Sequence, residues 1–291
     1  MKRQLTAPFD LCLCGLFAFL CGTAFLCAAP EINSFVIGAS GDERTVEFAY
    51  RRPAGDAWGV LLLVPGYNGP GKAMLDERWC RFADENALVL LAPTFQTTPE
   101  QLKREKGYYY PEQGSGRQVE QALMVVQRRC GVKTDKVLIF GFSAGAHFAH
   151  RFALWKPERV RAFVAYSAAW WSEPKSTLRD VPGLIMCGEA DHRYEATRAI
   201  MEKALALGIP WVWRSYRNTG HELTPAVRSM AEAFLGHYAD PMRNGQRREA
   251  VLYGDIQTYR VLPASEKELI PEEVRIELPS RHVAETWIKD D

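Results

Sequence analysis

Short apolar runs that alternate with helix-like segments constrain the fold of this chain more than any other feature of its sequence. The runs are rich in Val, Leu and aromatic residues, as is typical of strands that are covered on both faces. Buried strands that alternate with helices predict an α/β fold with a doubly wound, mostly parallel sheet. The runs, the last two with their loops, are residues 58–66, 88–95, 136–142, 160–167, 181–191 and 209–223.

Amphipathic segments fill the spaces between these runs. Residues 116–131 have helical spacing, with Val119, Leu123 and Val126 on one side. Residues 44–53 alternate enough to predict a strand at the edge of the sheet. In such a sheet, ligands bind beyond the carboxyl ends of the strands, so functional residues are expected in the loops that follow them. The other expected helices are residues 77–87, 144–156, 193–208 and 226–239.

The composition allows one large domain and gives little sign of its partners. The chain has 291 residues, 47% of them hydrophobic, which is ample for a single core that we place at residues 30–238. A balance of 36 basic and 35 acidic side chains gives no electrostatic reason to expect nucleic acid. The alternation stops after that domain, and residues 239–291 are expected to form a small C-terminal appendage packed on it.

The N-terminus has the order of a secretory signal. Lys2 and Arg3 come first, an uncharged apolar stretch from Leu11 to Ala29 follows, and Pro30 begins a polar region. The stretch is long for a signal and close to a membrane span, so residues 1–29 are expected to be a cleaved signal peptide or an uncleaved anchor. With the basic start kept inside, both forms place the main domain outside the cytoplasm, periplasmic or secreted. The membrane is a partner only if the segment stays uncleaved.

The cysteines predict neither a disulfide framework nor a zinc site. Four of the seven lie in the leader, and Cys80, Cys130 and Cys187 remain, an odd number with no C-x-x-C pair. One disulfide is the alternative in an oxidising compartment, but we expect three buried free thiols, and no metal.

The sequence Gly141-Phe142-Ser143-Ala144-Gly145 stands between an expected strand and an expected helix. It matches G-x-S-x-G in the context that its chemistry needs, a sharp strand-to-helix turn that exposes the serine hydroxyl. The helix N-terminus that follows favours developing negative charge. Ser143 is therefore a candidate nucleophile.

A serine nucleophile needs a base, and the base needs an acid to orient it. The order expected after this turn is serine, acid, histidine. Asp191 and His221 follow in that order, each in the loop after a later strand. Glu189 is the alternative acid, and His147, one helical turn after Ser143, is the alternative base. The remaining histidines, His150, His192, His237 and His282, lack such a context. Of these, His150 lies on the same helix face as His147.

Donors for an oxyanion are expected at two places. The backbone N–H of Ala144, directly after the nucleophile, is one. The other is expected from the glycine-rich loop after residues 58–66, where Tyr67 is the first candidate and Asn68 the second. Aromatic residues at the same end of the sheet could line a substrate pocket, and we single out Tyr109, Trp170 and Trp171.

These segments resemble the α/β-hydrolase superfamily, in particular compact secreted esterases related to polyhydroxybutyrate depolymerases, feruloyl esterases and dienelactone hydrolases. The resemblance covers about residues 44–238 and rests on "VLIFGFSAGAHFAHRFAL", "GLIMCGEAD" and "NTGHEL". It implies an eight-stranded sheet, a Ser143–Asp191–His221 triad, no metal and no organic cofactor. The chain departs from many members at Pro65-Gly66, where they carry His-Gly.

The sequence thus predicts an exported serine hydrolase that cleaves a small or oligomeric carboxylic ester through an acyl-enzyme. A serine peptidase, an acyltransferase and a non-catalytic binding protein on the same scaffold are the alternatives. The sequence names neither the ester nor an oligomeric state.

Overall fold

The computed structural model of the protein describes residues 31–39, 44–240 and 252–289. The predicted signal peptide or anchor at residues 1–29 lies outside these described residues. Within them, no helix has both the length and the apolar character that crossing a membrane requires.

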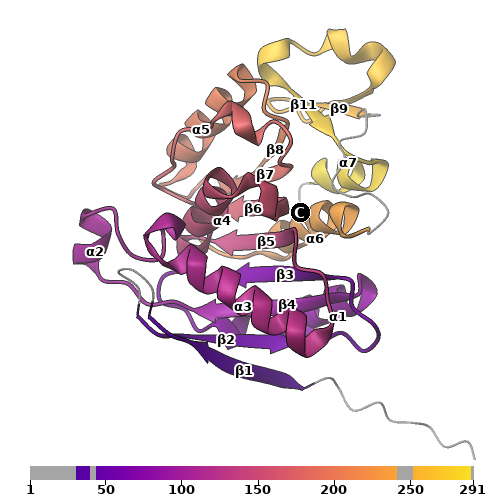
Figure 1. Cartoon of the computed structure of the whole chain (residues 1–291). Coiled ribbons are helices and arrows are strands. Elements are labelled where there is room, and N and C mark those ends of the chain that lie inside the picture. The colour runs from indigo at the N-terminus through magenta and orange to yellow at the C-terminus, as the bar shows by residue number, and fades with distance from the viewer. Residues whose placement is uncertain (1–30, 40–43, 241–251, 290–291) are drawn as a thin grey trace, which may run out of the picture.

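The centre of the molecule is an eight-stranded sheet in the order β1-β2-β4-β3-β5-β6-β7-β8. The six strands from β4 to β8 run parallel, and β2 pairs antiparallel with both β1 and β4. This arrangement confirms the prediction of a doubly wound, mostly parallel sheet (Figure 1). The strands are β1 (Ile32–Ile37), β2 (Val46–Arg51), β3 (Gly59–Val64), β4 (Leu88–Thr94), β5 (Val137–Phe142), β6 (Val160–Tyr166), β7 (Gly183–Gly188) and β8 (Trp211–Tyr216).

The prediction of an edge strand at residues 44–53 is wrong. That segment forms β2, which has a neighbour on each side, and the edge is β1. The buried side chains of β1 are only Phe35 and Ile37, so its alternation is too brief to predict a strand from the sequence. Four of the six residues of β2 from Phe48 to Arg51 are buried in a row, as expected for an internal strand.

Helices cover both faces of the sheet. In Figure 1, α3 and α4 lie in front of the strands, on the face opposite α1 and α6. Side-chain caps mark two starts, since Asp76 accepts from Trp79 N–H at α1 and Thr224 accepts from Val227 N–H at α6. The helices are α1 (Glu77–Glu85), α2 (Pro99–Lys103), α3 (Ser115–Cys130), α4 (Ala144–Trp155), α5 (Tyr194–Ala206) and α6 (Pro225–Ala239).

The C-terminal residues form a three-stranded antiparallel sheet and a helix beside β8. The order is β10 (Val261–Pro263), β9 (Leu252–Asp255), β11 (Arg275–Leu278), followed by α7 (Arg281–Trp287). β8 is the far edge of the main sheet, and an exposed edge leaves backbone groups unpaired. Two side chains meet this need: Trp287 Nε1–H donates to Trp213 O at 2.5 Å, and Ser215 N–H donates to the Tyr259 hydroxyl at 3.0 Å.

The three cysteines among the described residues are free thiols. Only Cys187 is buried, whereas Cys80 and Cys130 are half-buried, so the expectation of three buried thiols is wrong for two of them. Both of these sit on helices, α1 and α3, at positions that turn partly away from the sheet.

Candidate active site

Ser143 occupies a strained turn between β5 and α4. Its φ of 56° and ψ of −114° lie in a region that a residue with a side chain rarely adopts, and its N–H donates to Tyr166 O at 2.8 Å. A Cβ at Gly141 would collide with the carbonyl oxygen of Gly145, and a Cβ at Gly145 would collide with that of Val64. The two glycines of the motif are therefore needed for close backbone approach, which leaves the serine at the tip of the turn.

The structure brings His221 and Asp191 to this serine. His221 Nε2 lies 2.8 Å from Ser143 Oγ, and His221 Nδ1 lies 2.7 Å from Asp191 Oδ2. Because a carboxylate can only accept, the Nδ1 proton is assigned to the bond with Asp191, which leaves the Nε2 lone pair for the serine hydroxyl. The ring of Phe142 stacks on His221 with centroids 4.9 Å apart and helps to hold the imidazole.

Backbone hydrogen bonds join the two loops that carry the histidine and the acid. Glu189 N–H donates to Tyr216 O at 2.9 Å, and Ala190 N–H donates to Thr219 O at 3.0 Å. The loop after β7 and the loop after β8 therefore run together as one unit. This pairing explains how residues 30 positions apart in the chain come into contact.

Asp191, not Glu189, is the carboxylate that contacts the histidine. The side chain of Asp191 is fully buried, and Glu189 is exposed and accepts a hydrogen bond from Ser215 Oγ at 2.8 Å. Burial alone would raise the pKa of Asp191, but hydrogen bonds from His221 and then from Arg193 hold it below its ordinary value. The sequence did not single out Arg193, because nothing in its local pattern indicates a contact with the neighbouring carboxylate.

His147 has both ring nitrogens engaged and contacts the nucleophile only through its backbone. Nδ1 lies 2.9 Å from Ser143 O, and Nε2 accepts N–H groups from Ala169 and Trp170 at 3.1 and 2.9 Å. Burial, followed by the charge of Arg151, lowers the pKa of His147 to about 3. Both contacts require a neutral imidazole with its proton on Nδ1, which does not suit a base for the serine.

The polar side of α4 is buried, and its side chains bind the loop that follows β6. His150 repeats the pattern of His147, with Nδ1 3.0 Å from Ala146 O and Nε2 accepting from Ser172 N–H at 3.0 Å. Arg151, only 6% exposed, donates to Tyr109 O and Trp170 O. Together these side chains fix the loop after β6, which borders the serine.

The backbone donors expected for an oxyanion lie beside Ser143. A Cβ at Gly66 would lie 3.7 Å from the Ser143 Cβ, so the loop of Tyr67 is close to the nucleophile. Asn68 N–H faces the hydroxyl of Tyr108 at 3.4 Å, and the Asn68 side chain bonds the backbone of Thr97. Among the described residues, the N–H groups of Tyr67 and Ala144 have no hydrogen-bond acceptor. This pattern favours Tyr67 over Asn68 as the second donor.

Two of the three aromatic residues proposed for the pocket pack on His147, one helical turn after Ser143. Tyr109 stacks on the His147 ring with centroids 4.7 Å apart, and Trp170, 55% exposed, lies 5.6 Å from the same ring. Burial, and then the charge of Tyr67, raises the pKa of Tyr109 to about 12. Trp171 instead packs on His150, and its Nε1–H donates to Thr197 Oγ1 at 3.3 Å. Trp171 therefore packs beside a part of α4 that is further from Ser143.

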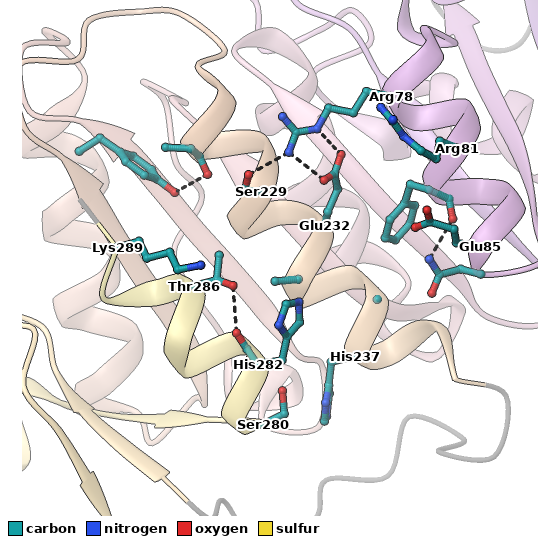
Figure 2. A pocket seen from close by; sticks show the side chains of 16 residues that line it. Arg78, Arg81, Glu85, Ser229, Glu232, His237, Ser280, His282, Thr286 and Lys289 are labelled. Atoms are coloured by element: carbon teal, nitrogen blue, oxygen red, sulfur yellow. Dashed lines mark hydrogen bonds and ion pairs between the residues drawn. The ribbon is translucent and has the colours of Figure 1, made fainter. Parts of the chain in front are cut away.

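The other histidines lie elsewhere. His192 is exposed beside Asp191, and His237 and His282 line a cavity of about 870 Å³ between α1, α6 and α7 (Figure 2). Ser143 does not line this cavity. Figure 2 shows Arg78 of α1 pointing at Glu232 of α6, and the two form an ion pair with a shortest separation of 2.6 Å. The pairing holds the two helices together at one side of the cavity.

Comparison with known proteins supports the fold and the family. The sequence profile of the Dienelactone hydrolase family matches residues 93–234. No curated protein matches the chain significantly. Three similar solved structures are an S-formylglutathione hydrolase from Agrobacterium tumefaciens, a poly(3-hydroxybutyrate) depolymerase from Bordetella parapertussis and a ferulic acid esterase.

The similarity extends over nearly the whole of these proteins at low sequence identity. The S-formylglutathione hydrolase is 17% identical with a TM-score of 0.59, over 73% of this chain and 95% of that one. The depolymerase is 20% identical with a TM-score of 0.56, over 76% and 92%. The ferulic acid esterase is 13% identical with a TM-score of 0.58, over 72% and 98%. The chain thus has the α/β-hydrolase fold, and its residues 93–234 match the sequence profile of the Dienelactone hydrolase family.

Proposed function

We propose that the protein hydrolyses carboxylic esters with Ser143 as nucleophile, His221 as general base and Asp191 as the acid that orients the histidine. The observation that carries the proposal is the unbroken chain of two short hydrogen bonds, 2.8 Å from Ser143 to His221 and 2.7 Å from His221 to Asp191. These distances lie within the reach required for proton transfer from nucleophile to base.

The reaction proceeds in two halves. His221 Nε2 takes the hydroxyl proton as Ser143 Oγ bonds to the ester carbonyl carbon, and the oxyanion that forms accepts hydrogen bonds from Ala144 N–H and Tyr67 N–H. The imidazolium returns its proton to the leaving alcohol as the ester C–O bond breaks, which leaves an acyl-enzyme. A water molecule then attacks the acyl carbon, with the same proton path, and releases the carboxylic acid and the free serine.

An ester with a flat or ring-shaped group beside the carbonyl suits the aromatic surroundings of Ser143. Trp170 supplies an exposed face on which a planar or sugar-like group could stack, and the buried Tyr109 ring packs behind it with centroids 6.1 Å apart. Trp171 is left out of this pocket because its indole is engaged with His150 and Thr197. The similar structures of an S-formylglutathione hydrolase, a ferulic acid esterase and a poly(3-hydroxybutyrate) depolymerase support ester-type substrates in general.

We also propose that the protein is exported. The support is the order of Lys2 and Arg3, the apolar stretch to Ala29 and the polar region that follows. Fractionation of cells that express the full chain, with N-terminal sequencing of the product, tests this directly. A full-length protein found in the cytosol would contradict it.

The test of the chemistry is labelling with a fluorophosphonate probe, followed by hydrolysis of a short p-nitrophenyl ester. The wild type is expected to label at Ser143 and to hydrolyse the ester, and Ser143→Ala to lose labelling and at least about 10³-fold of the activity. Ser176→Ala, at an exposed serine, is the matched control and should behave as the wild type. Equal rates for Ser143→Ala and wild type would refute the mechanism.

The same samples separate the alternatives. A panel of acetylated sugars, feruloyl esters, hydroxybutyrate oligomers and peptide amides distinguishes an esterase from a peptidase. Product formed with an added alcohol acceptor would indicate an acyltransferase. A non-catalytic binding protein would not react with the probe.

A further inference from the structure

The carboxylate of Asp191 has a partner that a Ser–His–Asp arrangement does not require. Oδ2 faces His221, and Oδ1 accepts two hydrogen bonds from Arg193, one from the backbone N–H at 3.1 Å and one from Nη1 at 3.0 Å. The carboxylate is fully buried, and the Arg193 side chain is 20% exposed. A guanidinium on a buried carboxylate is a charge-assisted bond, stronger than the bond from a neutral donor.

We propose that Arg193 is a positioning residue that locks the carboxylate of Asp191 and shares its negative charge, which weakens the attraction of that carboxylate for a proton on His221. The inference rests on the proposed function of Ser143, His221 and Asp191. It assigns the arginine no contact with the substrate.

The turn that carries both residues is fixed at each end. Asp191 N–H donates to Gly188 O at 3.1 Å, and Arg193 O accepts from Thr197 N–H at 3.0 Å in the first turn of α5. The guanidinium therefore reaches Oδ1 from the N-cap of α5, and His221 reaches Oδ2 from the loop after β8. Held at both oxygens from different elements, the carboxylate cannot rotate without breaking one of the two sets of bonds.

The electrostatic part follows from the sign of the charges. A lone carboxylate beside an imidazole stabilises the protonated ring, which cannot accept the serine proton. A guanidinium on the same carboxylate offsets that attraction. Its removal should therefore let His221 take up a proton at higher pH, and activity should be lost earlier on acidification.

Other titratable groups around the pair must be told apart from His221. His147 of α4, Tyr166 of β6 and Cys187 of β7 feel the charge of His221 or Asp191. Burial first of all lowers the pKa of His147 to about 3, raises that of Tyr166 and raises that of Cys187 to about 11, so none of them changes charge near neutral pH. His192 Nδ1 lies 3.5 Å from Asp191 Oδ1 on an exposed side chain, so the experiment includes a His192→Gln background.

The experiment measures the rate constant for fluorophosphonate labelling of Ser143, and kcat/KM for a p-nitrophenyl ester, as functions of pH. Arg193→Gln keeps a hydrogen-bond donor but removes the charge. The acid limb of the pH profile, where activity falls as the pH is lowered, is expected to move up by about one pH unit in this variant. That is the size of effect of one nearby charge at an effective dielectric of about 20. Arg193→Lys keeps the charge but replaces the planar guanidinium, whose Nη1 bonds Asp191 Oδ1, with a flexible ammonium group. Its acid limb should therefore stay in place, while kcat falls by about tenfold.

Controls separate the role of Arg193 from a general effect of losing an arginine. Arg198→Gln removes an exposed arginine of α5 that pairs with Glu202, and it should leave the profile unchanged. Circular dichroism melts establish that each variant is folded, and Arg193→Met provides a second neutral side chain if the Gln variant is not. The shift should persist in the His192→Gln background.

The outcomes distinguish this inference from the proposed function. A wild type that does not label at Ser143 overturns both. A wild type that labels normally, with an acid limb that stays in place in Arg193→Gln and Arg193→Met, overturns the role of Arg193 and leaves the triad intact. A limb that moves equally in Arg193→Lys would also overturn charge sharing, because that variant keeps the charge.

Discussion

The hydroxyl of Tyr259 lies 3.0 Å from the backbone nitrogen of Ser215, so a side chain of the C-terminal appendage completes the hydrogen bonding of the edge strand β8. The same hydroxyl lies 2.9 Å from Ser215 Oγ, which donates to Glu189 at 2.8 Å. Arg214 lies over the Tyr259 ring, 4.3 Å from its centroid. The appendage thus reaches, through two hydroxyls, the loop that carries Asp191.

Tyr259→Phe should destabilise the protein by about 1–2 kcal/mol, because the N–H of Ser215 loses its acceptor while the ring stays in place. Urea unfolding followed by circular dichroism measures the loss. Gln257→Ala, at an exposed side chain of the same turn, is the control and should change the stability by less than about 0.5 kcal/mol. Equal stability of Tyr259→Phe and wild type would mean that water satisfies the strand edge equally well.

His147 and His150 should make the protein sensitive to mild acid. Both are buried in neutral form, with pKa values lowered chiefly by burial, that of His147 to about 3. The unfolded chain therefore binds protons below about pH 6.5 that the folded protein does not, and stability falls as the pH falls through that window. Each histidine contributes a slope of at most about 1.4 kcal/mol per pH unit.

Unfolding free energies at about pH 7, 6 and 5 test this expectation. The slope should be smaller in His147→Gln than in the wild type, even though the variant is less stable at pH 7 through the loss of the bonds to Ala169 and Trp170. His282→Gln, at an exposed histidine of α7, should keep the wild-type slope. An unchanged slope in His147→Gln would show that His147 is not held neutral by the fold.

Two glycine substitutions should have opposite effects. Gly145→Ala should abolish the active-site turn, because its Cβ would meet the carbonyl of Val64, and soluble yield and ester hydrolysis should both fall sharply. Gly236→Ala, in the middle of α6, would place its Cβ in ordinary contact with Phe82 at 3.6 Å. It should stabilise the protein by about 0.5–1 kcal/mol, since alanine loses less backbone entropy in a helix. Melting temperatures compare the two.

The two adjacent tryptophans should separate binding from folding. Trp170→Ala removes an exposed ring near Ser143 and should raise KM for an aromatic ester by about tenfold with little change in stability. Trp171→Ala removes a ring packed on His150 and should lower the melting temperature with a smaller effect on KM. The ratio of kcat/KM for an aromatic and an acetyl ester in each variant is the readout. A change in that ratio only in Trp171→Ala would reverse the assignment.

The sequence was sufficient for the features that depend on order along the chain. Parallel strands bring their carboxyl ends to one edge, so placing Ser143, Asp191 and His221 after three strands of one sheet (β5, β7 and β8) was enough to expect them together. The buried strands were equally plain, because continuous apolar runs from Leu61 to Leu63 or Leu88 to Leu91 fit little else.

Features set by side-chain direction could not be read in the same way. Trp170 and Trp171 are neighbours in sequence, yet Trp170 is exposed beside His147 and Trp171 packs on His150. The burial of the polar face of α4 could not be predicted, because nothing local reveals that the loop after β6 folds over it. Arg193 was missed for the same reason, since its contact depends on a turn of the chain that brings residues two apart onto one oxygen.

The two edges of the main sheet differ in a way that matters for handling the protein. β8 is closed by Trp287 and Tyr259 close to the loops of the proposed site, whereas β1 at the opposite edge presents Val36 with 61% exposure. Immobilisation or labelling chemistry attached along β1 would leave the β8 side undisturbed, and cutting the chain before β9 would strip the closure from the strand that leads to His221. The β1 edge is therefore the suitable side for immobilisation or labelling, and the β8 edge should stay unmodified.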